Sequence, residues 1–454
     1  MAETWAISAL DLHLDLSGTR VRSALESALR DAVTTGRLAP DTKLPSSRAL
    51  AGDLGVARNT VADAYGQLVA EGWLIAQVGS GTRVATQPRA DTAPATRTPT
   101  PKVKYDLRAG APTLTAFPRT AWLTAARKAL TTAPADTLGY TDPRGQPALR
   151  QALAGYLARA RGVRVTPENM VICSGFTQAL GLLSEVLAAR GHTTMAIEAY
   201  GHHSHRTIPV KAGLRVTTIP VDDEGADVDD RADCVLLTPA HQFPLGVPLA
   251  AHRRATAAAR PGLVIEDDYD GEFRYDRHPV GALQALAPDH VIYAGTASKS
   301  LAPGIRLAWL VLPPDLVDEV AEAKYRADLL CGAIDQLTLA EFIWSGDYDR
   351  HIRRCRLAYR RRRDRLITEL RRTPVTGVAA GLHAVVELPD GVTEDDVTTR
   401  ALDHGLALEG LSEYHRGGRR RPPALVVGYA TPTDPTYTAA IARLGAVLAE
   451  RPKQ

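Results

Sequence analysis

A lysine placed between a buried strand and an arginine is the first candidate for chemistry in this sequence. Lys299 lies in the segment GTASKSLAPGIR, among small and hydroxyl-bearing residues, directly after the apolar run 291–295. A lysine amine in such a setting can form a Schiff base with an aldehyde. Ser298 and Arg306 can bind a phosphate beside it, the arginine as a bidentate fork. The segment therefore predicts a covalent attachment point next to an anion site.

Two further polar motifs suit the same chemistry. The segment IEDDY at 265–269 offers a carboxylate that can pair with a protonated pyridine nitrogen and keep the ring an electron sink. Its tyrosine can donate to a phenolic oxygen on that ring. The turn CSGFTQ at 173–178 joins a strand to a helix, and backbone N–H groups at a helix N-terminus can cradle phosphate.

Each motif follows a short apolar run, and these runs indicate the elements that must position the motifs. The runs lie at 170–173, 194–197, 234–237, 263–265, 291–293 and 307–312, and helical patterns separate them. Buried strands alternating with helices predict an α/β fold with a doubly wound, mostly parallel sheet. Ligands of such sheets bind at the C-terminal edge of the strands, where the motifs fall.

Taken in order, the motifs resemble those of fold-type I pyridoxal-phosphate enzymes of the aminotransferase class. The resemblance covers about 105–450 and includes the segments LGYTDPRGQPALRQALAGYL and TPAHQFPLGVPL. It implies pyridoxal 5′-phosphate as cofactor, Lys299 as the catalytic Schiff-base lysine, Asp267 as the partner of the pyridinium and Tyr269 as the donor to O3′. It implies that Tyr140 reaches the phosphate of the partner subunit, and that a small C-terminal α+β subdomain completes the fold. The phosphate-binding residues that it implies are Gly175, Phe176, Thr177, Ser298 and Arg306.

One departure from the family pattern concerns the aromatic residue that stacks on the cofactor. The family's E-x-P-G-Y segment reads EAYGHHSHR here, at 198–206. His202 takes the stacking position and can stack as an imidazole that titrates near neutral pH, with Tyr200 as the alternative. We do not expect the histidines of this loop to bind metal, because it has no carboxylate-rich partner nearby.

A second departure concerns the arginine that clamps the substrate's α-carboxylate in aminotransferases. The matching segment reads ALVVGYA at 424–430, with Val426 at the arginine position. Losing a bidentate clamp removes both binding energy and orientation. The sequence thus argues against ordinary transamination of an α-amino acid, unless a guanidinium comes from Arg416 or from the arginines of 353–365.

The first 85 residues show a different pattern. Helical spacing of apolar residues between Gly18 and Gly36 predicts one helix, and a second begins at Ser46 or Ser47. A third helix follows a three-residue turn, and strands at 73–75 and 83–84 predict a hairpin. Two short helices about a tight turn, followed by a hairpin, indicate a winged helix-turn-helix, whose second helix enters the major groove of DNA.

The string LPSSRALAGDLGVARNTVADAYGQLVAEGWL, followed by GSGTRV, resembles the GntR class of bacterial winged-helix repressors over about 18–84. The first residues of the second helix can reach phosphates or base edges, and glycines let the wing approach a minor groove. The predicted DNA-binding residues are Ser46, Arg48, Arg58, Asn59, Thr60, Gly79 and Gly81.

The composition and charge of the chain bear on how it binds DNA and on where it is located. The chain has 454 residues and a net charge of +3, but residues 1–84 carry eight Arg and Lys against nine Asp and Glu, so their net charge is −1. DNA affinity of this module must then come from focused positions. The sequence has no apolar run of membrane-span length, no secretory signal and no CxxC among its four cysteines, so we expect a cytoplasmic protein.

The order of segments resembles the MocR/GabR family of transcriptional regulators. We expect a GntR-type DNA-binding domain at 10–85, a Pro-rich flexible linker at 86–104 and an aminotransferase-like domain at 105–450 that dimerises and senses an effector. The segment HIRRCRLAYRRRRDRL at 351–366, also typical of that family, is interpreted as a solvated helix face, with a DNA contact or an effector site as alternatives.

The expected function is that of a homodimeric, pyridoxal-phosphate-dependent regulator that binds double-stranded operator DNA. The missing clamp favours sensing of pyridoxal phosphate itself and control of vitamin B6 genes. The alternatives are an active pyridoxal-phosphate-dependent aminotransferase with an accessory DNA-binding domain, a regulator whose amino-compound effector forms an external aldimine, and a DNA-binding protein whose aminotransferase-like body is a dimerisation scaffold. We expect no enzyme activity from the regulator.

Overall fold

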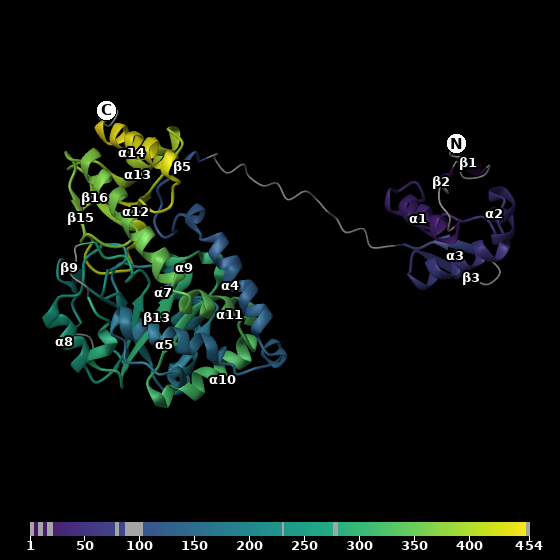
Figure 1. Ribbon diagram of the computed structural model, residues 1–454. Coiled ribbons are helices and arrows are strands. Elements are labelled where there is room, and N and C mark those ends of the chain that lie inside the picture. The colour runs from purple at the N-terminus through teal and green to yellow at the C-terminus, as the bar shows by residue number, and fades with distance from the viewer. Residues whose placement is uncertain are drawn as a thin grey trace. The chain divides into compact units, whose positions relative to one another are not determined.

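The computed structural model describes residues 4–7, 12–15, 21–77, 81–86, 103–228, 231–275 and 280–450. The chain forms two compact units, Met1–Pro99 and Thr100–Gln454 (Figure 1). Most of the predicted linker, 87–102, lies outside the described residues, and so does Gly79.

Helices α1–α3 and a β-hairpin make up most of the N-terminal unit. The elements are α1 (Val21–Thr34), α2 (Ser47–Leu54), α3 (Arg58–Ala70), β3 (Leu74–Gln77) and β4 (Gly81–Val84). Helix α2 begins after Ser46, whose hydroxyl accepts the N–H of Ala49 at 3.2 Å, and ends at Gly55, whose φ is 64°. Leu50 and Val61 lie in a core shared by the helices and the hairpin. The predicted winged helix-turn-helix is confirmed.

A further antiparallel hairpin, β1 (Thr4–Ile7) with β2 (Leu12–Asp15), precedes α1 and was not predicted.

A sheet of seven strands among the described residues forms the centre of the C-terminal unit. Its strands, in spatial order, are β6 (Met170–Cys173), β14 (Ala308–Val311), β13 (Val291–Thr296), β12 (Leu263–Asp268), β11 (Cys234–Leu237), β7 (Thr194–Glu198) and β8 (Arg215–Ile219). Neighbours pair in parallel except at β14, which is antiparallel to β13 and β6. The doubly wound, mostly parallel sheet is confirmed. Strand β8 adds to the predicted set.

Alternation along the strands buries both faces of this sheet. Ile172 and Trp309 point to one face and pack in a core with α5 (Pro147–Arg161), α11 (Ala333–Trp344) and α12 (Asp347–Glu369). Val171 and Leu310 point to the other, where α6 (Phe176–Ala189) and α10 (Val317–Asp328) cover them. Shorter or peripheral helices are α4 (Arg119–Thr132), α7 (His203–Lys211), α8 (Ala251–Ala259) and α9 (Ala297–Ser300).

A smaller α+β layer follows α12, as predicted. Its sheet contains β15 (Val375–Thr376), β16 (His383–Glu387), β19 (Ala424–Gly428) and β18 (Glu409–Gly410), with α13 (Glu394–Asp403) and α14 (Asp434–Ala449). Strand β5 (Tyr105–Asp106) pairs in parallel with β17 (Leu406–Ala407), so the start of the unit is joined to this late layer. A short hairpin of β9 (Val221–Asp222) and β10 (Gly225–Ala226) forms a separate two-stranded sheet.

Candidate functional site

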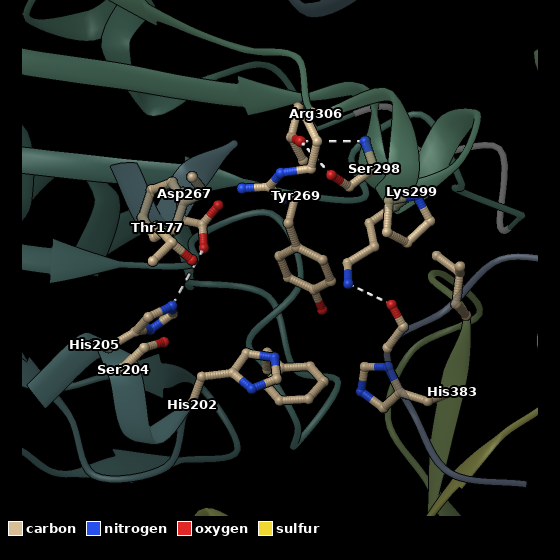
Figure 2. Close-up of a pocket in the computed structure, with 16 residues that line it drawn as sticks. Thr177, His202, Ser204, His205, Asp267, Tyr269, Ser298, Lys299, Arg306 and His383 are labelled. Carbon is tan, nitrogen blue, oxygen red and sulfur yellow. Dashed lines mark hydrogen bonds and ion pairs between the residues drawn. The ribbon is translucent and has the colours of Figure 1, made fainter. Parts of the chain in front are cut away.

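A cavity of about 270 Å³ lies at the C-terminal edge of the parallel strands (Figure 2). Side chains from the ends of β12 and β13, from the turn after β6 and from β16 converge on it. Eight of the predicted site residues line it, namely Phe176, Thr177, His202, Asp267, Tyr269, Ser298, Lys299 and Arg306.

Lys299 points into the cavity from α9, directly after β13 (Figure 2). Its Nζ donates a hydrogen bond to the backbone carbonyl of Gly110. Burial lowers the pKa of its ammonium group, and the negative charges of Asp267 and Asp270 oppose that shift. A lowered pKa raises the fraction of neutral amine, which is the form that attacks a carbonyl carbon.

Asp267 and Tyr269 reach the cavity from the end of β12. Asp267 is 6% exposed, and burial raises the pKa of its carboxyl group well above the ordinary value. Its Oδ2 lies 4.0 Å from Nε2 of His205, and the hydroxyl of Tyr269 lies 3.1 Å from Nδ1 of His241. Burial disfavours the charged form of Asp267, and the nearby imidazole of His205 is only weakly basic. A more strongly cationic group next to Asp267 would therefore stabilise the carboxylate.

The turn after β6 and the loop after α9 form an anion-binding wall. Gly175, the N-cap of α6, has φ 94° and ψ 163°, a region that is essentially restricted to glycine. A Cβ atom there would lie 2.7 Å from Nη2 of Arg306, which donates to the carbonyl of Ser174. The hydroxyl of Thr296 donates to that of Ser298 at 3.0 Å. A helix N-terminus, a guanidinium and hydroxyl groups together form a donor set that suits phosphate.

His202, rather than Tyr200, lies at the cavity. Its imidazole stacks on the ring of Phe243 at a centroid distance of 4.5 Å and an interplanar angle of 11°. Burial lowers the pKa of His202 to about 4, so the ring is neutral at physiological pH and the expected titration near neutral pH is wrong. Tyr200 is buried elsewhere: its ring lies 5.2 Å from that of His415, and its hydroxyl accepts the N–H of Arg421 at 2.8 Å.

The position expected for a carboxylate-clamping arginine is apolar. Val426 is fully buried in β19, where it pairs with Val385 of β16. Arg416 is an alternative source of a guanidinium. Its backbone N–H donates to the carbonyl of Ala199 at 2.7 Å. Its positive charge contributes to the low pKa of His202, after burial and the charge of Lys299. Arg416 does not line the cavity.

Tyr140 is 91% exposed and lies away from the cavity of its own chain. That it reaches a partner's phosphate therefore stays a prediction.

Eight lining residues were not predicted, namely Gly110, Ser204, His205, Phe243, Thr296, Pro303, Leu382 and His383. Gly110 and His383 come from segments far from any motif, so the sequence carries no signal for them. Phe243 lies within TPAHQFPLGVPL, and His205 within the loop at 198–206, so both were close to recognised motifs.

Helix α3 carries the predicted recognition residues at its start. Arg58 and Asn59 are exposed in its first turn, and Thr60 is partly exposed beside them. Arg48 is exposed in α2, and Gly81 opens β4 with φ 96°. These groups have the exposure that contact with a DNA groove requires.

The described residues contain no cluster of three or more His, Cys, Asp or Glu placed to hold a metal ion. Within the same residues, no helix is long and apolar enough to cross a membrane.

Comparison with known proteins divides the chain at the same place as the structure. Residues 21–84 match the family described as bacterial regulatory proteins, gntR family. Residues 102–444 match the family described as aminotransferase class I and II.

Solved structures share the fold of the C-terminal unit. The kynurenine aminotransferase of Pyrococcus horikoshii is 25% identical with a TM-score of 0.69, covering 78% of this chain and 93% of that one. The α-aminoadipate aminotransferase LysN of Thermus thermophilus is 26% identical with a TM-score of 0.67, over 76% and 91% of the two chains.

Relatives that match along nearly the whole length are transcriptional regulators. The pyridoxine biosynthesis transcriptional regulator PdxR of Corynebacterium glutamicum is 32% identical, over 94% of this chain and 95% of its own. The probable rhizopine catabolism regulatory protein MocR of Rhizobium meliloti is 30% identical over 89% of each chain. With a GntR-type winged helix joined to an aminotransferase-like unit, the chain belongs to the MocR/GabR family of transcriptional regulators.

Proposed function

We propose that the cavity holds pyridoxal 5′-phosphate and that the bound cofactor itself changes the affinity of this regulator for operator DNA. One observation carries the proposal. The cavity contains a donor set for the cofactor, whereas Val426 fills the place of the arginine that would hold an amino acid's carboxylate. A chain that can hold the cofactor without that clamp suits a sensor of the cofactor.

The residues present fit this group on three counts. Gly175 and the guanidinium of Arg306 pack so closely that a Cβ atom on Gly175 would displace the guanidinium. The hydrogen-bond donors of this wall suit a phosphate. Asp267 is a buried carboxylate that a protonated pyridine nitrogen would stabilise. Lys299 is an amine of lowered pKa, positioned to form a bond with an aldehyde.

When bound, pyridoxal phosphate supplies an aldehyde carbon for covalent attachment and an electron-withdrawing ring. Each residue of the cavity would then have a separate role in binding the cofactor. Lys299 would attach the cofactor, Asp267 would keep a proton on the ring nitrogen, and the hydroxyl of Tyr269 would donate a hydrogen bond to the phenolic oxygen of the ring. Thr177 and the N–H groups at the start of α6 would donate hydrogen bonds to the phosphate, and Arg306 would neutralise part of its charge. His202, stacked on Phe243, forms a flat wall for a ring.

The names of relatives support control of vitamin B6 genes. PdxR is named as a regulator of pyridoxine biosynthesis, and this chain matches it over 94% of its length. A regulator of that pathway that responds to pyridoxal phosphate would report the pathway's own product. The mechanism requires two conformations of the protein that differ in affinity for the cofactor and for DNA.

We also infer a homodimer. Tyr140 is 91% exposed in its own chain, and exposed apolar side chains, including Leu123 and Leu138, lie on α4 and near Tyr140 in the chain. Such side chains are available for burial against a second copy. Two copies would present two copies of α3, with Arg58 and Asn59 reading bases and Arg48 contacting the backbone of a palindromic site.

The test is a titration of the DNA upstream of the vitamin B6 genes with the full-length chain, with and without pyridoxal phosphate. The cofactor should change the affinity or the footprint, whereas pyridoxal, which lacks the phosphate, should act only at much higher concentration. Lys299→Ala should abolish most of the response. Equal affinity and footprint in the presence and absence of the cofactor would show that direct sensing is wrong.

A second measurement separates the regulator from an active enzyme. Multiple turnovers of amino-group transfer from amino acids to keto acids would support the aminotransferase alternative. The buried Val426 predicts that such turnover is absent, because no arginine of β19 is available to orient the substrate.

A further inference from the structure

Helix α12 has a charge distribution that the cavity does not explain. It runs for 23 residues from the part of the unit with the large sheet to the part with β15–β19 (Figure 1). Nine of its residues are arginines and four are acidic. None of these arginines lines the cofactor cavity.

One side of α12 is anchored in the protein. Its buried residues include Tyr348, Ile352, Cys355, Tyr359 and Leu366. Three of its arginines, Arg356, Arg362 and Arg363, also donate hydrogen bonds to partners outside the helix. Nε of Arg362 donates to Oδ1 of Asp434 at 2.9 Å, and Arg356 donates to the carbonyl of Glu272. The helix is therefore held in place from one side, which presents its other side to solvent in a defined orientation.

The opposite side carries cations without partners. Arg353, Arg354, Arg361 and Arg365 are exposed, and none makes a hydrogen bond or ion pair with the described residues. At 100° per residue they fall within about 120° of the helix circumference, and they span about 18 Å along the axis. The acidic residues of this side are paired with other arginines: Asp364 lies 4.0 Å from Arg360, and Asp347 lies 2.7 Å from Arg350. A merely solvated helix face would more commonly alternate the signs of its charges.

We propose that this face of α12, defined by Arg353, Arg354, Arg361 and Arg365, binds the phosphate backbone of duplex DNA. The proposal rests on the DNA binding proposed above for the N-terminal unit. Residues 1–84, which read the bases, have a net charge of −1 and contribute little general attraction for a polyanion. Arginine is suited to phosphate by its planar fork of donors. The C-terminal unit would thus add affinity, and the N-terminal unit sequence specificity.

The salt dependence of DNA binding tests the proposal. The variant is the full-length chain with Arg353→Gln, Arg354→Gln, Arg361→Gln and Arg365→Gln. The matched control loses four exposed cations elsewhere on the same unit, by Lys211→Gln, Arg215→Gln, Arg419→Gln and Arg420→Gln. Binding to an operator duplex and to a random duplex of equal length is measured from low to moderate salt. Thermal unfolding and the cofactor's absorbance check that both variants are folded.

Each phosphate contact contributes about 0.9 to the slope of log K against log salt concentration, so losing four contacts per chain lowers the slope by up to about 3.6 for each chain that touches DNA, or about 7.2 for a homodimer. We expect this decrease for the α12 variant on both duplexes, and the wild-type slope for the control. An unchanged slope in the α12 variant would overturn the proposal and leave an acidic protein as the partner of this face.

The same titrations separate this inference from the proposed function. If the wild-type chain shows no response to pyridoxal phosphate while the α12 variant loses slope, the sensing function fails and the α12 contact stands. If the cofactor response is present and the slope is unchanged, the reverse holds.

Discussion

Replacing Gly175 by alanine tests the anion-binding wall with a single methyl group. The backbone of Gly175 lies in a region that costs other residues about 1–3 kcal/mol. The added Cβ would lie 2.7–2.9 Å from three atoms of the Arg306 guanidinium, so this group must move away from the wall. A hydrogen bond to a charged group contributes about 1.5–3 kcal/mol. Since 1.4 kcal/mol is a factor of ten, cofactor affinity should fall by about 10- to 100-fold.

The affinity is measured by absorbance titration of the full-length variant with pyridoxal phosphate. Gly155→Ala is the matched control, because Gly155 lies within α5 with no heavy atom within 4 Å of an added Cβ. Thermal unfolding without cofactor separates the two terms: backbone strain lowers stability, whereas displacement of Arg306 weakens phosphate binding alone. Wild-type affinity in Gly175→Ala would refute the assignment of this wall to the phosphate.

Three further predictions concern DNA, covalent attachment and acid stability. Arg58→Ala should weaken operator binding by about 1–3 kcal/mol and relax its specificity in gel-shift assays, whereas Arg22→Ala should not; equal affinity would dismiss α3 as the recognition helix. After borohydride treatment with pyridoxal phosphate, mass spectrometry should find the cofactor on Lys299, and Lys299→Ala should remain unmodified. Burial lowers the pKa of His383 to about 3 from 6.5, so the unfolded chain binds its proton first as pH falls. Denaturant titrations should therefore show the wild type losing stability relative to His383→Gln between about pH 6.5 and 3, with full stability above pH 6.5; a pH-independent difference would contradict the neutral state of this histidine.

The motifs that follow strands were predictable because their reactive residue types stand directly after apolar runs, at the sheet edge where ligands bind. Lys299 and Asp267 come directly after apolar runs, and parallel strands bring their C-terminal ends to one edge. Strand β8 was missed because it lies at the edge of the sheet, where partly exposed positions interrupt the apolar run that reveals the central strands.

The remaining parts of the site depend on tertiary contacts. Gly110 and His383 reach the cavity from segments more than 80 residues away from Lys299, and only the packing of the late α+β layer places them there. Tertiary contacts also determine whether His202 or Tyr200 lies at the cavity. Their spacing of two residues is compatible with either ring facing the cavity, and the pairing of Tyr200 with His415 leaves His202 at the cavity.

Thermodynamic reciprocity provides a test of the proposed coupling between the cofactor and DNA. Pyridoxal phosphate is titrated into the full-length chain with and without saturating operator DNA, and its dissociation constant is obtained from absorbance. Whatever factor the cofactor imposes on DNA affinity, DNA must impose on cofactor affinity, and coupling of this kind is typically about 5- to 150-fold. We expect two different dissociation constants whose ratio matches that factor. Identical constants with and without operator DNA would contradict the proposed coupling.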